Sequence, residues 1–265
     1  MPSKYLIVMT GEGRFINQTL VWNNQAFKEI KKRHNSNIRK STYDILISVW
    51  NNYLEDIDTS LWEHGNVLIN LIDSKLGTSD RLTNEFGWSS QLCRAYAINQ
   101  ITDHIKIYDY NMILITRADL IYRIFSDFDA KLIGNIFDTC YGRTTVPLFK
   151  LIRHYTKKQW QCDDRLLVYT PEILEHMNKH LLEVTTNLML ELKHLSISAH
   201  VLVLKILEDV LDLHSSAEII PMPLSLEYQH LHSLVRYPIS DLEYSLSNFN
   251  YIKSFEGDLQ YRYKN

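Results

Sequence analysis

The chain has 265 residues, 45% of them hydrophobic and 22% charged, and its net charge is −3. This length suits one large α/β domain or two small ones. The small negative charge argues against a partner held mainly by phosphate neutralisation, such as bulk nucleic acid. The three cysteines, Cys93, Cys140 and Cys162, form no Cys-x-x-Cys pair, which predicts free thiols in a reducing compartment and no zinc site.

No apolar stretch reaches the ~18 residues that a membrane helix needs, and no long apolar core of a signal peptide precedes the first strand pattern. We therefore expect a soluble, cytoplasmic protein without a transmembrane segment. Peripheral contact with a membrane surface stays open.

The first half of the chain alternates strand and helix patterns. Helical spacing of apolar residues predicts helices at residues 17–32 and 84–101. Apolar runs with β-branched residues predict buried strands at residues 5–9, 43–50, 67–72 and 112–115. The alternation is typical of a doubly wound or related three-layer α/β fold with a mainly parallel sheet.

The second half is more helical. Helices are predicted at residues 146–155, 171–183 and 198–213. Thr170 suits the N-cap of the second of these helices, and Pro171 suits its first position. Strands are predicted at residues 131–137, 165–169 and, as a late edge strand, 219–220. The tail from residue 225 onward is rich in tyrosine and is interpreted as a segment that wraps around the body.

Polar residues follow two of the predicted buried strands. The first strand leads into Thr10-Gly11-Glu12-Gly13-Arg14, and a glycine-containing turn after a strand often faces phosphate. The turn lacks the third glycine of a dinucleotide fingerprint, so an ordinary strand-to-helix turn is the alternative. Arg14 favours the phosphate interpretation, because a guanidinium binds phosphate in a bidentate manner.

The strand at residues 112–115 ends in Thr116, Arg117 and Asp119. Open α/β sheets bind ligands at the carboxyl ends of their strands, so these side chains are candidate ligand contacts. The alternative is a core strand capped by a surface ion pair. In the preceding helix, Gln91 and Arg94 are spaced as neighbours on one helix face.

Together these motifs resemble GT-A-type glycosyltransferases, and most closely the WavE-like lipopolysaccharide-synthesis proteins and related viral glycan-building enzymes. The resemblance covers about residues 4–170. It rests on Thr-Gly-x-Gly-Arg at residues 10–14, Ile-Ser-Val-Trp at 47–50, Gln91, the motif Tyr-Asp-Tyr-x-x-Ile-Leu-Ile-Thr-Arg-Ala-Asp-Leu at 108–120, and Asp-Asp-Arg-Leu-Leu-Val-Tyr at 163–169.

The resemblance implies a nucleotide-sugar donor that lies across the carboxyl ends of the strands. Arg117 and Asp119 would occupy the turn that is Asp-x-Asp in many GT-A enzymes, and Arg117 departs from that pattern. Asp119 with the diphosphate oxygens could hold a divalent cation, Mn²⁺ or Mg²⁺; alternatively, Arg117 supplies the positive charge. The residues predicted to bind the donor are Thr10, Gly11, Arg14, Gln91, Arg94, Arg117 and Asp119.

The resemblance also places an acid before the short strand at residues 165–169. An acceptor hydroxyl needs a carboxylate general base if the anomeric centre inverts. Asp163 and Asp164 are the candidates, with Asp164 favoured because it lies closer to the strand. An exposed pair that caps the strand is the alternative.

The sequence thus predicts a single GT-A-like α/β domain over residues 1–265. Residues 1–125 would bind the nucleotide-sugar, and residues 126–265 would form the acceptor half and the wrapping tail. The predicted function is transfer of a sugar from a nucleotide-sugar to a glycan or glycolipid acceptor in polysaccharide biosynthesis. The alternative is a non-catalytic nucleotide-sugar or glycan-binding module of the same fold. A methyltransferase or other Rossmann enzyme is disfavoured, because the second strand ends in Ser48-Val49-Trp50 rather than in an acid.

Overall fold

The computed structural model describes residues 3–33, 40–53, 56–76, 88–122, 124, 126–140, 145–146, 148–151, 159–162, 166–192, 199–212, 220–221 and 232–234. Its helices are α1 (Ile16–Arg33), α2 (Trp88–Asn99), α3 (Ile101–His104), α4 (Asp127–Cys140), α5 (Pro171–Leu192) and α6 (Ala199–Asp212). Its strands are β1 (Lys4–Glu12), β2 (Thr42–Trp50), β3 (Val67–Ile72), β4 (Met112–Arg117), β5 (Leu120–Tyr122), β6 (Thr145–Val146), β7 (Leu148–Leu151), β8 (Gln159–Cys162), β9 (Leu166–Tyr169), β10 (Ile220–Pro221) and β11 (His232–Leu234).

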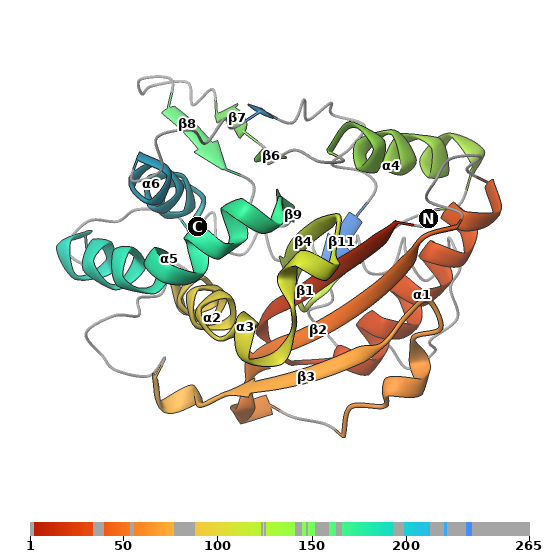
Figure 1. Cartoon of the computed structure of the whole chain (residues 1–265), viewed down its shortest axis with the longest axis horizontal. Coiled ribbons are helices and arrows are strands. Elements are labelled where there is room, and N and C mark those ends of the chain that lie inside the picture. The colour runs from red at the N-terminus through yellow and green to blue at the C-terminus, as the bar shows by residue number, and fades with distance from the viewer. Residues whose placement is uncertain are drawn as a thin grey trace, which may run out of the picture.

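The main sheet has, within the described residues, seven strands in the order β10-β6-β9-β4-β1-β2-β3 (Figure 1). β1 lies between β4 and β2 and is parallel to both, and β3 is parallel to β2. β9 runs antiparallel to β4. The prediction that the first strand and the strand at residues 112–115 share one sheet is therefore confirmed, with Tyr5 paired to Met112. The predicted α/β class with a mainly parallel sheet is confirmed as well.

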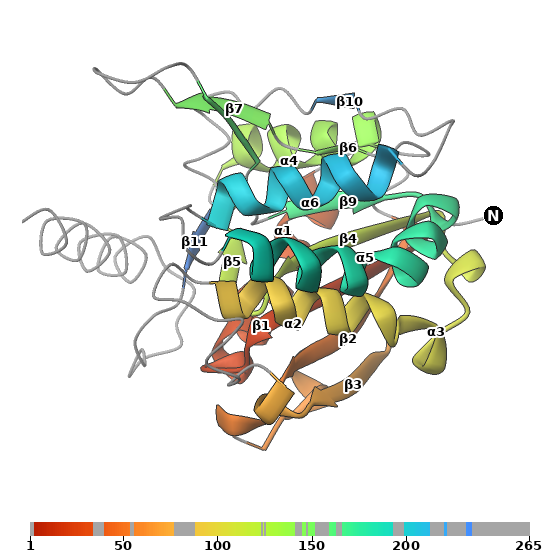
Figure 2. The same cartoon turned by 90° about the vertical axis from the view of Figure 1, so that its left-hand side faces the viewer.

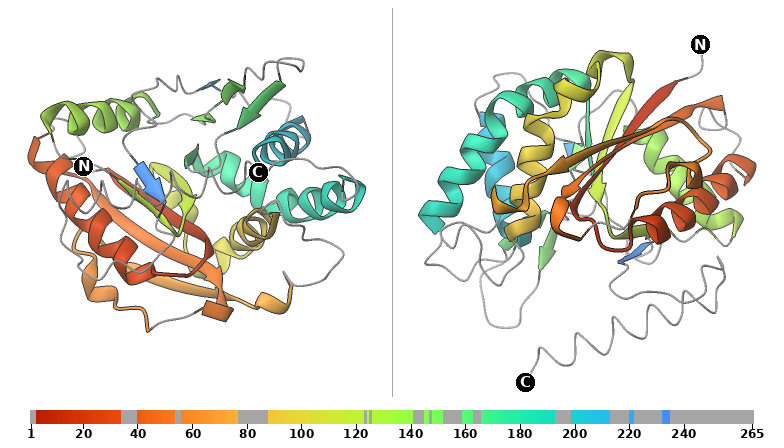
Figure 3. Two further views of the ribbon diagram at one scale, coloured as in Figure 1. Left: turned by 180° about the vertical axis from the view of Figure 1, so that it is seen from behind. Right: turned by 90° about the horizontal axis from the view of Figure 1, so that it is seen from below.

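Helices cover both faces of this sheet. The right-hand panel of Figure 3 shows α1 and α4 on one side and α2, α5 and α6 on the other. In Figure 2, α2, α5 and α6 are seen in front of the sheet. Alternate residues of β1 pack on opposite faces of the sheet. Ile7 and Met9 belong to the core with α1, and Leu6 and Val8 belong to the core with α2 and α5. This period of two is what a strand buried on both faces requires.

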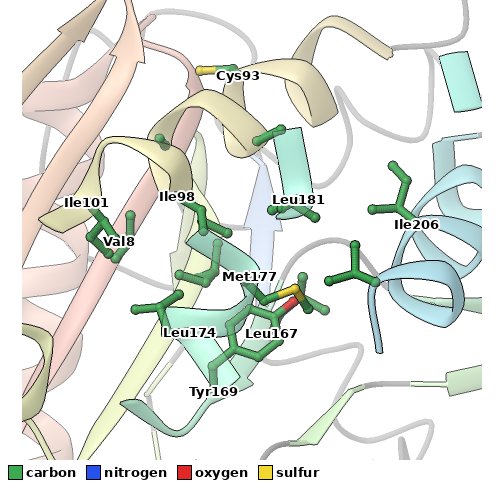
Figure 4. Packing of buried hydrophobic residues seen from close by; sticks show 14 of the residues in the cluster. Val8, Cys93, Ile98, Ile101, Leu167, Tyr169, Leu174, Met177, Leu181 and Ile206 are labelled. Atoms are coloured by element: carbon green, nitrogen blue, oxygen red, sulfur yellow. The ribbon is translucent and has the colours of Figure 1, made fainter. Parts of the chain in front are cut away.

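The core on the α2 and α5 face is continuous from β1 to β9. Figure 4 shows Val8, Ile98 and Leu174 close together, with Met177 beside Tyr169. A polar contact also joins the two helices. The side-chain amide of Asn178 in α5 donates to the carbonyls of Ile98 (2.8 Å) and Asn99 (2.7 Å). The last carbonyls of a helix have no partner within the helix, so Asn178 caps the end of α2 and fixes α5 against it.

Several predictions for the second half need correction. Residues 131–137 are not a strand but part of α4. Its start carries a reciprocal capping box, in which the Ser126 hydroxyl accepts from the Asp129 N–H (3.1 Å) and the Asp129 carboxylate accepts from the Ser126 N–H (2.9 Å). Of the helix predicted at residues 146–155, Val146 belongs to β6 and residues 148–151 form β7, which pairs with β8; residues 147 and 152–155 lie outside the described residues.

The other predicted elements of this half are present. The helix predicted at residues 171–183 is α5, which continues to Leu192, and Thr170 caps it through a bond from the Ile173 N–H to its hydroxyl (3.4 Å). The helix at 198–213 is α6, the strand at 165–169 is β9, and the late edge strand is β10. Of the predicted tail, β11 pairs with β5; the rest lies outside the described residues.

Within the part of the chain that the structure describes, no helix combines the length and the apolar character needed to cross a membrane.

Candidate functional site

The carboxyl ends of β1 and β4 meet at one edge of the main sheet, which we call the carboxyl edge and define by residues 10–14 and 116–119. Thr10 is the register partner of Arg117. Its hydroxyl donates to the Thr116 carbonyl (3.3 Å), and its carbonyl accepts from the Ala118 N–H (2.9 Å). Two sequence segments that are 106 residues apart are thus joined through their backbones.

Gly11 sets the direction of the chain as it leaves β1. Its φ of +113° lies in a region that strains any residue with a Cβ atom. Its N–H donates to the Cys93 sulfur (3.3 Å), and its Cα faces Ser90 in the first turn of α2. The glycine of the predicted turn is therefore needed for conformation, and it brings β1 against the N-terminal end of α2.

Arg14 projects from the same turn into solvent. Its side chain is 47% exposed and forms an ion pair with Glu12 at 2.9 Å. The next residue, Phe15, has a φ of 56° just before α1 begins. A non-glycine residue in this region costs conformational energy, so the packing of the turn holds it there and keeps Arg14 at the carboxyl edge.

Arg117 and Asp119 form a two-pronged ion pair. Nε of Arg117 donates to Oδ1 of Asp119 and Nη2 donates to Oδ2, both at 2.8 Å. The two side chains are 22% and 20% exposed. The structure therefore places a fixed guanidinium, reachable by solvent, on the strand next to Thr10.

Gln91 and Arg94 lie one helical turn apart in α2, and the predicted neighbour relation is present. Nη1 of Arg94 donates to Oε1 of Gln91 at 2.8 Å. With exposed fractions of 3% and 5%, the two residues are nearly covered. They lie below the surface of the edge, and their contact with a donor stays a prediction.

The predicted catalytic residues Asp163 and Asp164 lie outside the described residues. The strand that follows them, β9, begins at Leu166, and Leu166 is the register partner of Thr116 at the end of β4. The first residue of β9 is therefore at the carboxyl edge. The role of the two acids stays a prediction.

Asn23 of α1 is a site residue that the sequence analysis missed. Its Oδ1 accepts from the Tyr122 N–H (3.0 Å) and its Nδ2 donates to the Leu120 carbonyl (2.9 Å). The side chain is buried and forms hydrogen bonds with both ends of β5, which begins directly after Asp119. The available signal was the pair Asn23-Asn24 between the apolar residues Leu20 and Phe27 of the predicted helix.

The predicted metal site has little support in these side chains. Among the described residues, no group of three or more His, Cys, Asp or Glu side chains could hold a metal ion. Both carboxylate oxygens of Asp119 already accept hydrogen bonds from Arg117. A hard cation prefers several oxygen ligands, so the described residues do not by themselves fit one, and metal binding by Asp119 stays a prediction.

Cys93 lies close to the carboxyl edge, but its thiol is buried and unreactive. Burial raises the pKa of its thiol to about 12, against weaker effects of hydrogen bonds from the backbone and the charge of Arg94. The thiolate is the reactive form of cysteine, so Cys93 is no candidate nucleophile.

No protein-family profile and no curated protein matches the chain. Solved structures that are similar in fold include two with long coverage. One is mouse xyloside xylosyltransferase 1 in its apo form, with 10% identity over 86% of this chain and 90% of that chain, at a TM-score of 0.44. The other is an active-site mutant of LgtC, with 11% identity over 96% and 95% of the two chains, at a TM-score of 0.49. Similarity at this level does not tell what this chain binds or transfers.

Proposed function

We propose that the protein is a nucleotide-sugar-dependent glycosyltransferase that moves a sugar to a glycan or glycolipid acceptor. One observation carries the proposal. The two segments that the sequence resemblance assigns to the donor, residues 10–14 and 116–119, meet at one edge through the pairing of Thr10 with Arg117. That edge is where open α/β sheets bind their ligands.

The side chains of the edge suit the chemistry. As the bond to the sugar breaks, negative charge develops on the leaving nucleoside diphosphate. Arg14 and Arg117 offer positive charge there, and stabilisation that is strongest in the transition state increases the rate. Both arginines are partly exposed, so a diphosphate can reach them.

The acceptor hydroxyl requires a base if the reaction inverts the anomeric centre. We assign this role to Asp164, with Asp163 as its alternative, because β9 follows them and begins beside the end of β4. Replacement of each acid in turn, with donor binding measured beside turnover, tests the assignment.

A screen for donors tests the proposed function. Melting temperatures are measured with UDP-, GDP-, CMP- and dTDP-sugars, each with and without Mn²⁺. We expect one nucleotide class to raise the melting temperature, and we expect slow release of free nucleotide from its sugar conjugate. Binding without any release would instead indicate the non-catalytic module. No binding in any condition would contradict both.

Arg14→Ala is the first variant to test. We expect nucleoside diphosphate affinity to fall by about 10- to 100-fold, since loss of a charge-assisted contact costs roughly 1.5–3 kcal/mol. Arg33→Ala is the matched control, because Arg33 is an arginine of α1 that pairs with Glu29 and Asp127. Equal affinity in the two variants would remove Arg14 from the site.

A further inference from the structure

We propose that the Arg117–Asp119 pair is an exchangeable anion site, in which the donor diphosphate replaces the Asp119 carboxylate on the guanidinium without a divalent cation. This inference rests on the proposed function and specifies how its site binds the donor. In the absence of donor, Asp119 occupies the position that a phosphate oxygen pair takes later.

The geometry of the pair is the first support. Nε and Nη2 of Arg117 donate in parallel to the two oxygens of Asp119, both at 2.8 Å. This edge of a guanidinium fits carboxylate and phosphate alike, because both present two acceptor oxygens to the same two donors. A diphosphate can therefore take over the two N–H groups without any change in the position of Arg117.

The location of the pair is the second support. Arg117 ends β4, and its backbone is fixed by the pairing with Thr10. Asp119 is two residues further, at the end of the turn that leads into β5. The backbone of Asp119 is held on both sides, by the hydrogen bond from the Ala118 N–H to the Thr10 carbonyl and by the one from Asn23 to the Leu120 carbonyl. Only the side chain of Asp119 has to rotate for the exchange.

The balance of charge is the third support. The two side chains are 22% and 20% exposed, so water and the incoming anion can reach the pair and offset part of the cost of losing the Asp119 contact. A diphosphate carries more negative charge than one carboxylate, and Arg14, whose exposed partner is Glu12, is a second cation at the same edge. The incoming anion thus binds more strongly than the residue that it displaces.

A cation bound at Asp119 fits these residues less well. A metal would have to displace Arg117 from both oxygens of Asp119 and would then lie beside a guanidinium of like charge. Within the described residues, Asp119 also belongs to no group of three acidic or metal-binding side chains. Arg117 itself supplies the positive charge that the diphosphate needs.

The test is isothermal titration calorimetry of UDP, GDP, dTDP and CMP, which are the nucleotides that the four donor classes of the screen release, in EDTA and again with Mn²⁺. We expect one of them to bind in EDTA. Asp119→Asn should then bind it roughly three-fold tighter, about 0.7 kcal/mol, because the competing carboxylate is gone. Arg117→Lys, which keeps the charge and loses the two-pronged geometry, should bind roughly ten-fold more weakly. If Asp119→Asn does not fold, Asp119→Ala is measured in its place.

Asp127→Asn is the matched control, since Asp127 forms an ion pair with Arg33 at the same distance, 2.8 Å, away from the carboxyl edge. Its affinity should equal that of the unmodified protein. Binding that needs Mn²⁺, or unchanged or weaker binding in Asp119→Asn, would overturn the exchange and leave the proposed function standing. If no nucleotide binds in either condition, the proposed function itself is wrong.

Discussion

Two aspartates form ion pairs at opposite edges of the same sheet, in very different surroundings. At the amino ends of β1 and β2, which we call the amino edge and define by Lys4 and Asp44, the Asp44 side chain is 4% exposed and lies 2.9 Å from Nζ of Lys4. It also accepts from the Tyr110 hydroxyl (2.9 Å) and from the backbone and side-chain N–H groups of Asn66 (2.8 and 3.2 Å). At the carboxyl edge, Asp119 is five times more exposed, and its hydrogen bonds described here come from Arg117.

The difference separates a structural carboxylate from an exchangeable one. Burial tends to raise the pKa of Asp44, but the hydrogen bonds from Asn66, Lys4 and Tyr110 and the charge of Lys4 outweigh it, so that the pKa lies below its usual value. The neighbouring Gly65 is packed so closely that a Cβ atom there would lie 2.3 Å from the Tyr43 carbonyl. An incoming ligand cannot displace such a group, whereas Asp119 has neither the burial nor the number of donors.

The largest effect is expected for Asp44→Ala. The variant leaves the Tyr110 hydroxyl and the donors of Lys4 and Asn66 without their acceptor, and we expect the free energy of unfolding to fall by about 3 kcal/mol. Urea titration measures the loss. Nucleotide affinity should not change in the fraction that stays folded. A lower affinity would mean that Asp44 also affects the binding site, which contradicts a purely structural role.

The loss in Asp44→Ala should also depend on pH. Because the folded-state pKa of Asp44 lies below its ordinary value of 3.8, the carboxylate stabilises the fold fully above that value and loses its effect as the pH falls through the folded pKa. The gap between the unfolding free energies of the unmodified protein and the variant should be constant from neutral pH to about pH 5 and should narrow below about pH 4. A gap that widens on acidification would contradict this assignment.

A middle effect is expected for Asn23→Ala. Two hydrogen bonds to β5 are lost and buried backbone groups are left unsatisfied, so we expect a cost of about 2 kcal/mol in unfolding free energy. Because β5 follows Asp119 directly, nucleotide affinity should fall as well. The adjacent Asn24→Ala is the control: Asn24 accepts from the Glu63 N–H instead (3.0 Å), so its loss should reduce stability and leave affinity unchanged.

The smallest effect is expected for Tyr110→Phe, which removes one donor from Asp44 and keeps the ring. We expect a cost of about 1 kcal/mol, the usual value of one hydrogen bond, because Lys4 and Asn66 still bind the carboxylate. Chemical denaturation of both variants, Tyr110→Phe and Asp44→Ala, measures the ratio of their losses in unfolding free energy. Equal losses of unfolding free energy in the two variants would mean that, of the donors to Asp44, only the Tyr110 hydroxyl contributes to stability.

The parts of the fold that the sequence predicted share a physical signal that is local. Apolar runs with β-branched residues, such as residues 112–115, favour strands of an inner sheet, and both strand ends that carry polar residues reach the same edge. Thr170 and Pro171 likewise marked the start of α5 correctly. For the type of each element, residues close together in the sequence carry the signal.

One miss had a local signal that the apolar run at residues 131–137 outweighed, the Ser126-x-x-Asp129 capping box; the others depend on contacts between residues that are far apart in the sequence. The strand predicted at residues 131–137 is helical because the box between Ser126 and Asp129 starts a helix several residues earlier. Residues 148–151 form a strand because β8 pairs with them. The bond pattern of Asn23 depends on a strand 97 to 99 residues away. The sequence predicted Arg117 and Asp119 as ligand contacts and gave an ion pair between them as the alternative. Their spacing of two residues is compatible with both arrangements.

The insertion of β1 between β2 and β4 has a consequence for synthesis. β1 is made before both of its partners, and β4 follows 106 residues later, as the Thr10–Thr116 bond shows. At about 5–20 residues per second, a ribosome needs roughly 5–20 s to cover that distance. During this time the growing chain can pair β1 with β2, while the other side of β1 has an unpaired backbone that invites aggregation. We therefore expect slow translation between residues 50 and 112 to reduce the yield of active protein more than an equal delay after residue 117.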